Sequence, residues 1–230
     1  MLELANIRKA FNQGQHNEYW ALKGIDLEIP PARVNVLKGP SGSGKTTLLT
    51  ILGCLARPTE GRVRLKGEDI SGLPERFLTE IRRSTFGFIF QQFNLIPYLS
   101  AADNIALPCR FSPLRAQRAG DIGAAVARLA GHLDLPSELL ARPAAELSVG
   151  QQQRVAAARA LIGAPALVVA DEPTSALDAA RQDAFLDLLL GECAAAGASL
   201  LFVSHDLRLA GRFDRCVALS DFNAAAEATA

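Results

Sequence analysis

Residues 39–47 read GPSGSGKTT and match the pattern G-x-x-x-x-G-K-[ST]. An apolar run predicted to be a strand, 34–38, comes before them, and a predicted helix, 44–54, follows them. The glycines allow successive backbone N–H groups to turn towards phosphate oxygens, and the start of the helix adds partial positive charge. Lys45 supplies a cation for the β- and γ-phosphates, and the Thr46 hydroxyl is a ligand for Mg²⁺. A Gly-rich turn without a ligand is the alternative. The residues predicted to bind ATP here are Gly39, Pro40, Ser41, Gly42, Ser43, Gly44, Lys45, Thr46 and Thr47.

Two acidic residues end a second apolar run, in ALVVADEPTSALD at 166–178. Ligands of open α/β sheets bind beyond the carboxyl ends of the strands, so Asp171 is placed to hold Mg²⁺, directly or through water. Glu172 is expected to polarise the water that attacks the γ-phosphate. A third predicted strand ends at SHD, where His205 is expected to hydrogen-bond the γ-phosphate or the water. The alternative is that all three are solvated loop residues.

The rest of the chain predicts an α/β protein in which short β-rich runs alternate with helical patterns. Strands are predicted at 2–7, 25–29, 34–38, 62–65, 86–90, 166–170, 199–203 and 215–219. Helices are predicted at 44–54, 74–83, 115–132, 151–162, 176–195 and 206–211. The first third has strands without intervening helices, which favours an antiparallel meander. Strand signals disappear from about 97 to 150, which favours a helical insertion into the core.

Composition argues against several classes of protein. The chain has 230 residues with 24 basic and 24 acidic side chains, so it lacks the basic excess of a nucleic-acid binder. The four cysteines are scattered without a C-x-x-C pair, which argues against zinc sites and disulfides. No secretory segment begins the chain, and its apolar runs are far shorter than the roughly 18 residues of a membrane span. We therefore expect a soluble chain whose membrane role comes through a partner.

The stretch LSVGQQQR, 147–154, concentrates polar residues ahead of an alanine-rich helix. Ser148 and Gln151 have the spacing of a capping box, in which each side chain satisfies a backbone N–H group of the other. By itself this pattern predicts only the start of a helix.

Five motifs occur in a fixed order: residues 39–46, Gln91, LSVGQ (147–151), DEPTSALD (171–178) and SHD (204–206). In this order they resemble the motifs of ABC-type ATPases, and the resemblance covers essentially the whole chain. The stretches LGCLARPTEGRV, FIFQQFNLIP and ADNIALP further resemble the lipoprotein-release and macrolide-export branch of that family.

The resemblance implies roles for individual residues. Gln91 would sense Mg²⁺ and water, joining Thr46 and Asp171 at the metal and Glu172 and His205 in catalysis. Phe11 would stack on adenine, with Tyr19 and Trp20 as competitors. Asp178 would communicate across a dimer. The signature residues that would act on the ATP of a partner chain are Ser148, Gly150 and Gln151.

The resemblance also implies a fold: a RecA-like P-loop NTPase core with a mostly parallel sheet, an N-terminal antiparallel β subdomain and an α-helical insertion. The whole chain, 1–230, would form one ATPase domain, with the β subdomain and α/β core over 1–96 and 151–230. The helical subdomain would cover about 97–150 and end in the signature motif. Val149 stands where the family usually has glycine, and Ala32 and Arg33 stand where a Gly-Glu pair is common.

The function implied is ATP hydrolysis with Mg²⁺, with a head-to-tail dimer that closes on ATP and drives a membrane permease. The partners would be that permease and a second copy or a homologous ATPase domain, without nucleic acid. The location would be cytoplasmic, on the inner face of the cell membrane. Two alternatives are an ATP-binding regulatory module with little hydrolysis and a soluble ABC ATPase of DNA repair or translation. Glu172 and His205 argue against the first. The absence of long coiled coils, zinc modules and a second ATPase domain argues against the second.

Overall fold

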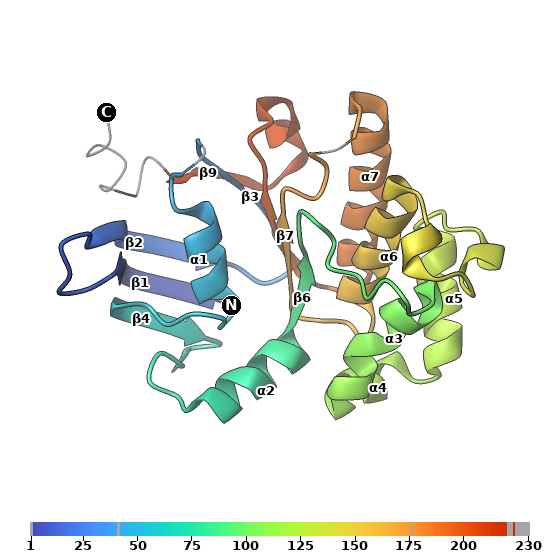
Figure 1. Ribbon diagram of the computed structural model, residues 1–230, viewed down its shortest axis with the longest axis horizontal. Helices are drawn as coiled ribbons and strands as arrows, with labels where there is room; N and C mark the ends of the chain where they lie inside the picture. Colours follow the sequence, from blue (N-terminus) through green and yellow to red (C-terminus); the bar gives the residue numbers. More distant parts are fainter. Residues whose placement is uncertain (1, 41, 176, 220–222, 224–230) are drawn as a thin grey trace. The chain divides into compact units, whose positions relative to one another are not determined.

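The computed structural model describes residues 2–40, 42–175, 177–219 and 223 (Figure 1). The chain divides into two compact units. The first comprises Met1–Arg82 and Leu201–Ala230, and the second comprises Arg83–Leu200. Each unit contains one group of the predicted functional residues, so each is described in turn.

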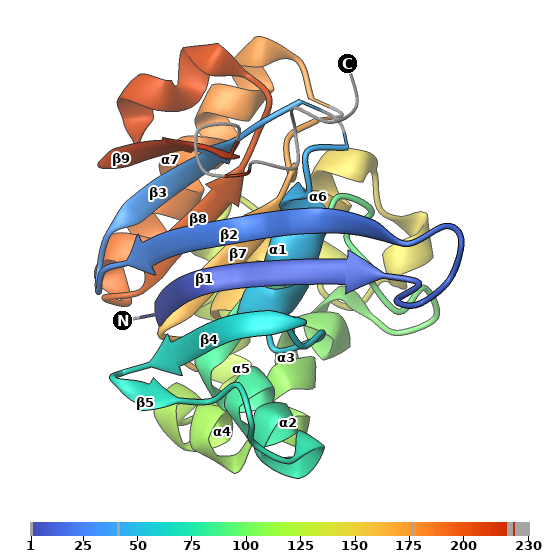
Figure 2. The same cartoon turned by 90° about the vertical axis from the view of Figure 1, so that its left-hand side faces the viewer.

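An antiparallel sheet in the first unit has the strand order β2-β1-β4-β5 (Figure 2). Its strands are β1 (Leu2–Phe11), β2 (Tyr19–Ile29), β4 (Glu60–Leu65) and β5 (Glu68–Asp69). The predicted antiparallel arrangement is confirmed, but a meander order is wrong, because β1 pairs with both β2 and β4. The first two strands also run further than predicted. Their outer halves carry single buried residues, Ala10 and Leu22, between half-buried or exposed neighbours, a pattern that the apolar runs alone did not include.

The rest of the first unit surrounds helix α1. Its elements are β3 (Val34–Lys38), α1 (Lys45–Leu52), most of α2 (Glu75–Thr85), most of β8 (Ser199–Val203), the 3₁₀ helix η3 (Leu207–Arg212) and β9 (Arg215–Ala218). Strand β3 pairs with β9 in parallel. The Ser204 N–H donates to the Leu37 carbonyl at 3.2 Å, so the end of β8 lies beside the end of β3. The side chains of Leu48, Ile51 and Leu52 on α1 are buried.

The second unit places helices around two parallel strands (Figure 1). The strands are β6 (Phe86–Ile89) and β7 (Leu167–Asp171), with Ile89 opposite Ala170. The helices are α3 (Ala101–Phe111), α4 (Pro113–Ala119), α5 (Ile122–His132), α6 (Val149–Leu161) and α7 (Ala179–Ala195), with 3₁₀ turns η1 (Ser137–Leu139) and η2 (Ala144–Glu146). A Cβ atom at Gly87 would lie 2.2 Å from the Ala160 carbonyl oxygen, so only glycine lets β6 pack this closely on α6.

Arg115 attaches α4 to the C-terminal end of α6. Its side chain is buried, with 2% exposure, and its guanidinium donates to the carbonyls of Phe86, Ala160 and Ile162. Burial lowers the pKa of Arg115 to about 10. The carbonyls at the end of a helix carry partial negative charge, so the cation is held where the helix favours it.

Two helix predictions are corrected by the structure. Helix α3 was not predicted, because Asp103, Asn104 and Pro108 interrupt its apolar pattern; Ser100 caps it by accepting the Asp103 N–H. The predicted helix 115–132 is two helices, since Gly120 has a φ of 66° and Asp121 begins α5 as its N-cap. All residues of 97–150 are described, and they contain these helices and no strand beyond a single bridge between Ser100 and Pro143. The extent of a helical subdomain stays a prediction.

Candidate nucleotide-binding site

The phosphate loop leads from β3 into α1 by a path that requires glycine. Gly42 and Gly44 have φ values of 78° and 94°, in the left-handed region that side chains disfavour. A Cβ atom at Gly44 would lie 2.8 Å from the Ala21 carbonyl oxygen and 2.8 Å from the Leu22 side chain. The loop is therefore pressed against β2, and α1 begins at Lys45 directly after it.

Two polar groups of this loop suit an anion. The Lys45 ammonium donates to the carbonyls of Gly39 and Pro40, at 2.7 and 2.8 Å, so the cation is held over the loop. The Ser43 hydroxyl is buried without a hydrogen-bond partner among the described atoms. A buried polar group of this kind is costly unless a partner reaches it, and a phosphate oxygen is such a partner. Thr46 is exposed at the first turn of α1, and Thr47 is half-buried. Ser41 lies outside the described residues.

Sequence reasoning missed Asn223, which fastens the loop to β2. Its side chain has 2% exposure; the amide donates to the carbonyls of Ser43 and Ala21, at 3.1 and 3.0 Å. Its carbonyl oxygen accepts the Lys23 N–H at 2.9 Å. One side chain thus bridges a strand and the phosphate loop, 180 residues apart along the chain. The only signal in the sequence was an amide in an otherwise alanine-rich end, which predicts nothing by itself.

Asn223→Ala is expected to weaken ATP binding about tenfold, because the bonds to Ser43 and β2 together contribute on the order of 1–2 kcal/mol to the geometry of the loop. Titration with a fluorescent ATP analogue measures the change. Asn223→Asp keeps the acceptor for Lys23 and loses the donor to both Ser43 and Ala21, so it separates the accepted bond from the two donated ones. An unchanged affinity in Asn223→Ala would show that the loop holds its shape without the bridge.

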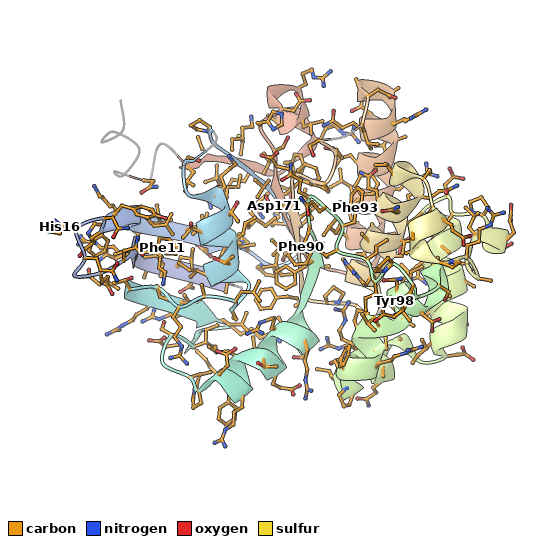
Figure 3. All side chains as sticks on the ribbon, in the orientation of Figure 1. Phe11, His16, Phe90, Phe93, Tyr98 and Asp171 are labelled. Carbon is orange, nitrogen blue, oxygen red and sulfur yellow. The ribbon has the colours of Figure 1, made fainter. Side chains whose placement is uncertain are left out.

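Phe11, the predicted adenine-stacking residue, lies at the end of β1 (Figure 3). It pairs with Tyr19 across the sheet, and the two rings stack with centroids 5.4 Å apart. The Lys9 ammonium lies 5.5 Å from the Phe11 centroid. Trp20 pairs with Ala10 and therefore points to the opposite face of the strand pair from Tyr19. The structure thus brings Phe11 and Tyr19 together and separates Trp20 from them; which ring contacts adenine stays a prediction.

His205 is exposed and follows the end of β8, beside the strand that leads into the phosphate loop. The neighbouring Asp206 caps η3 and accepts hydrogen bonds from the side chain and backbone of Arg208. These bonds, with the positive charge of Arg208, lower the pKa of Asp206 to about 2. The turn that carries His205 is therefore fixed by a carboxylate that stays ionised across the physiological range.

In the second unit, three predicted residues follow the carboxyl ends of paired strands. Asp171 ends β7 (Figure 3), Glu172 comes next, and Gln91 lies two residues beyond β6. Because β6 and β7 are parallel, these side chains share one edge of the sheet. Mg²⁺ prefers oxygen ligands, so the carboxylate of Asp171 and the amide oxygen of Gln91 suit that ion by their chemistry. In the first unit, the Thr46 hydroxyl also offers an oxygen ligand. Among the described residues no group of three or more His, Cys, Asp or Glu could hold a metal.

The signature residues lie at the start of α6. Ser148 is the N-cap: its hydroxyl accepts the Gln151 N–H at 3.4 Å, and its own N–H donates to the Gln151 amide oxygen at 2.9 Å. The predicted capping box is confirmed. The predicted start of the helix at 151 is wrong by two residues, because Val149 already has helical geometry. Among the residues that the structure describes, none would come within 4 Å of a Cβ atom at Gly150, so this helix start is open within the described part of the chain. Asp178 similarly caps α7 by accepting the Arg181 N–H.

With both groups of residues described, comparison with known proteins decides the family. The sequence pattern of the ABC transporter family matches residues 22–175. The chain belongs to the ABC transporter family.

The relatives of this chain include proteins about three times its length and proteins of about its own length. The macrolide export ATP-binding/permease protein MacB of Nitrosomonas europaea is 42% identical over 225 residues, which are 96% of this chain and 33% of that protein. The chain thus spans about a third of the length of such relatives. The lipoprotein-releasing system ATP-binding protein LolD of Roseobacter denitrificans is 41% identical over 219 residues, 95% of either protein. This ABC chain therefore resembles both branches predicted from its sequence.

A solved structure agrees with the fold. A dimeric post-hydrolysis state of the ATP-binding cassette MJ0796, bound to ADP and Pi, matches with a TM-score of 0.84 and 36% identity. The match covers 95% of this chain and 94% of that one. The predicted family and α/β fold are confirmed. No described helix of this ABC chain has the length and apolar character needed to cross a membrane.

Proposed function

We propose that this chain is the ATP-binding and ATP-hydrolysing subunit of an export-type ABC transporter. The observation that carries the proposal is the phosphate loop on α1, with Lys45 held over it and a buried Ser43 hydroxyl inside it. The carboxylates at the end of β7 supply the second requirement, a metal ligand and a base. Copurification with a permease, and Mg-dependent phosphate release by the assembled complex, are the direct tests.

The residues act on ATP as follows. The loop N–H groups and Lys45 bind the β- and γ-phosphates, and the exposed Phe11 ring takes the adenine. Thr46, Asp171 and Gln91 would hold Mg²⁺, which would neutralise phosphate charge when bound. Glu172 accepts a proton from the attacking water while the water oxygen bonds to the γ-phosphorus. The bond between the γ-phosphorus and the β,γ-bridging oxygen breaks, and its electron pair stays on ADP. His205 donates to the γ-phosphate and steadies its charge.

The signature residues serve the ATP of a partner chain. The open start of α6 supports this role, because N–H groups at a helix N-terminus bind anions and no described atom lies within 4 Å of a Cβ built at Gly150. The Ser148 hydroxyl accepts a bond within the cap and keeps its own hydrogen for a phosphate oxygen. The partner is a second copy or a homologous cassette. The pair docks on a permease at the cytoplasmic face of the membrane, and cassette closure on ATP moves that permease.

Two variants test the shared site, since each removes a different half of it. Lys45→Ala loses the phosphate cation, and Ser148→Arg loses the cap and blocks the helix start, so neither homodimer is expected to turn over ATP. Random mixing makes half of the dimers mixed, each with one intact site of two, so activity is expected to recover to about a quarter of the unmodified level. Steady-state phosphate release measures the recovery.

Dimer formation on ATP, measured by light scattering, is the accompanying control. It covers the case in which both sites must act together and no recovery occurs. The shared site is contradicted if the rate of phosphate release is first order in monomer concentration and no dimer forms at any ATP concentration.

A further inference from the structure

Three successive glutamines near the start of α6 each use a side-chain amide differently. Gln151 accepts the Ser148 N–H within the capping box, and Gln152 donates to the Leu147 carbonyl at 2.9 Å. Both bonds stay within the turn that begins the helix. Gln153 instead donates to the carbonyl of Pro173 at 2.9 Å, 20 residues further along the chain. Its side chain is buried, with 1% exposure.

The acceptor belongs to the residue directly after Glu172, where the backbone is unusual. Glu172 has a φ of 44°, in the left-handed region that residues other than glycine rarely adopt. Such a conformation persists only when surrounding contacts fix it. One contact is local, the Ser175 N–H donating to the Glu172 carbonyl at 3.2 Å. The others come from outside the turn.

Two buried glutamines hold this turn from two helices. Gln153 of α6 binds the Pro173 carbonyl, and Gln182 of α7 donates to the Thr174 hydroxyl at 2.9 Å. Thr174 is itself buried. The direction of the Glu172 side chain follows from the backbone of residues 172–174, so these two bonds help to set where the carboxylate points.

We propose that Gln153 is a positioning residue for Glu172 and links the signature helix to the catalytic base of the same chain. The proposal rests on the function proposed above, in which Glu172 is the base. Helix α6 carries Ser148 and Gly150 at its first turn and Gln153 at its second. A displacement of this helix start, when it receives the phosphate of a partner's nucleotide, is passed through one hydrogen bond to the Pro173 carbonyl. Contact between the start of α6 and the partner's ATP thereby changes the position of Glu172 in the same chain.

Gln153→Met tests this, because methionine has a similar length and flexibility but no N–H donor. We expect kcat to fall about tenfold or more, as small misplacements of a reacting group do, while the KM for ATP and the affinity for a fluorescent ATP analogue stay within about twofold. Gln152→Met is the matched control: it removes an amide bond from the same helix without touching the turn after Glu172, and its kcat is expected to stay near that of the unmodified chain.

A role in stability alone is separated from positioning by a double-mutant cycle. If Gln153 acts through Glu172, adding Gln153→Met to Glu172→Gln lowers the remaining single-turnover hydrolysis little further. A general loss of packing lowers it by the same factor in both backgrounds. If Gln153→Met does not fold, Gln153→Glu is measured in the same cycle, because it keeps the volume of the side chain and replaces the amide donor.

Failure of the positioning role of Gln153 can be distinguished from failure of the proposed function. A chain that does not hydrolyse ATP in its complex, or a Glu172→Gln variant with normal turnover, overturns the proposed function or its base. If the unmodified chain is active and Glu172→Gln is not, normal kcat in the folded Gln153 variant overturns this inference alone. Equal losses in both backgrounds overturn it as well.

Discussion

Glu172→Gln is expected to keep ATP binding and to lower ATP turnover about a hundredfold or more. The amide has the shape of the carboxylate but cannot accept the proton of the attacking water, and positioned general bases contribute rate factors of about 10²–10⁴. The turn itself is expected to survive the change, because its hydrogen bonds to Ser175, Gln153 and Gln182 are made by the backbone and by the neighbours Pro173 and Thr174. The left-handed backbone at residue 172 is no harder for glutamine than for glutamate.

Two measurements check this result. Phosphate release reports turnover, and size-exclusion chromatography with ATP reports the dimer, which is expected to accumulate because hydrolysis no longer opens it. Glu146→Gln is the matched control, since Glu146 is an exposed acid in η2 of the same unit, and its turnover is expected to be unchanged. Near-normal phosphate release by Glu172→Gln would contradict its assignment as the base.

The parts of the site that sequence predicts are those with a local cause. The phosphate loop is predictable because its backbone needs positive φ values, which glycine adopts readily. Gly42 and Gly44 have such values. The capping box at Ser148 and Gln151 involves residues three apart, so its spacing predicts its hydrogen bonds. The apolar runs that end at Lys38 and Asp171 predict strands because short apolar runs bounded by turn residues are typical of buried strands in parallel sheets.

The parts that sequence does not predict depend on contacts between distant residues. Asn223 reaches Ala21 across 202 positions, and no local pattern marks it. Helix α3 contains a proline and polar residues, yet packing against α6 and the Ser100 cap hold it as a helix. The left-handed backbone at Glu172 belongs to a residue type that avoids this region, and buried partners from two helices surround it. Tertiary contacts override local preference in each case.

Val149 and Gly150 offer a pair of substitutions with opposite expected outcomes. Val149 is the first residue of α6 and has 52% exposure, so neither its backbone nor its packing requires valine or glycine. Val149→Gly is therefore expected to change turnover only about threefold, the size typical of exposed positions without a special contact. The valine that stands in place of the family's usual glycine then does not mark an inactive site.

Gly150→Val is expected to abolish turnover, with a loss of more than about a hundredfold, comparable to the loss of a donor to a developing anion. A Cβ atom here meets no described atom within 4 Å, and the residue has no positive φ. The variant should consequently fold, and valine even has the better helix propensity. Under the function proposed above, the added methyl groups obstruct the partner's phosphate at this helix start.

Thermal unfolding and phosphate release, measured on both variants, separate these effects. A Gly150→Val chain with an unchanged melting temperature and no turnover supports a nucleotide of the partner at this position. Normal turnover in that variant would show that no phosphate of the partner's nucleotide binds at the start of α6. A hundredfold rise in Val149→Gly would instead identify the native chain as a low-activity form and favour a regulatory module. Because the two positions are adjacent on one helix turn, any general effect of disturbing α6 appears in both variants. The difference in turnover between the two variants is therefore the measure of contact with the partner's ATP.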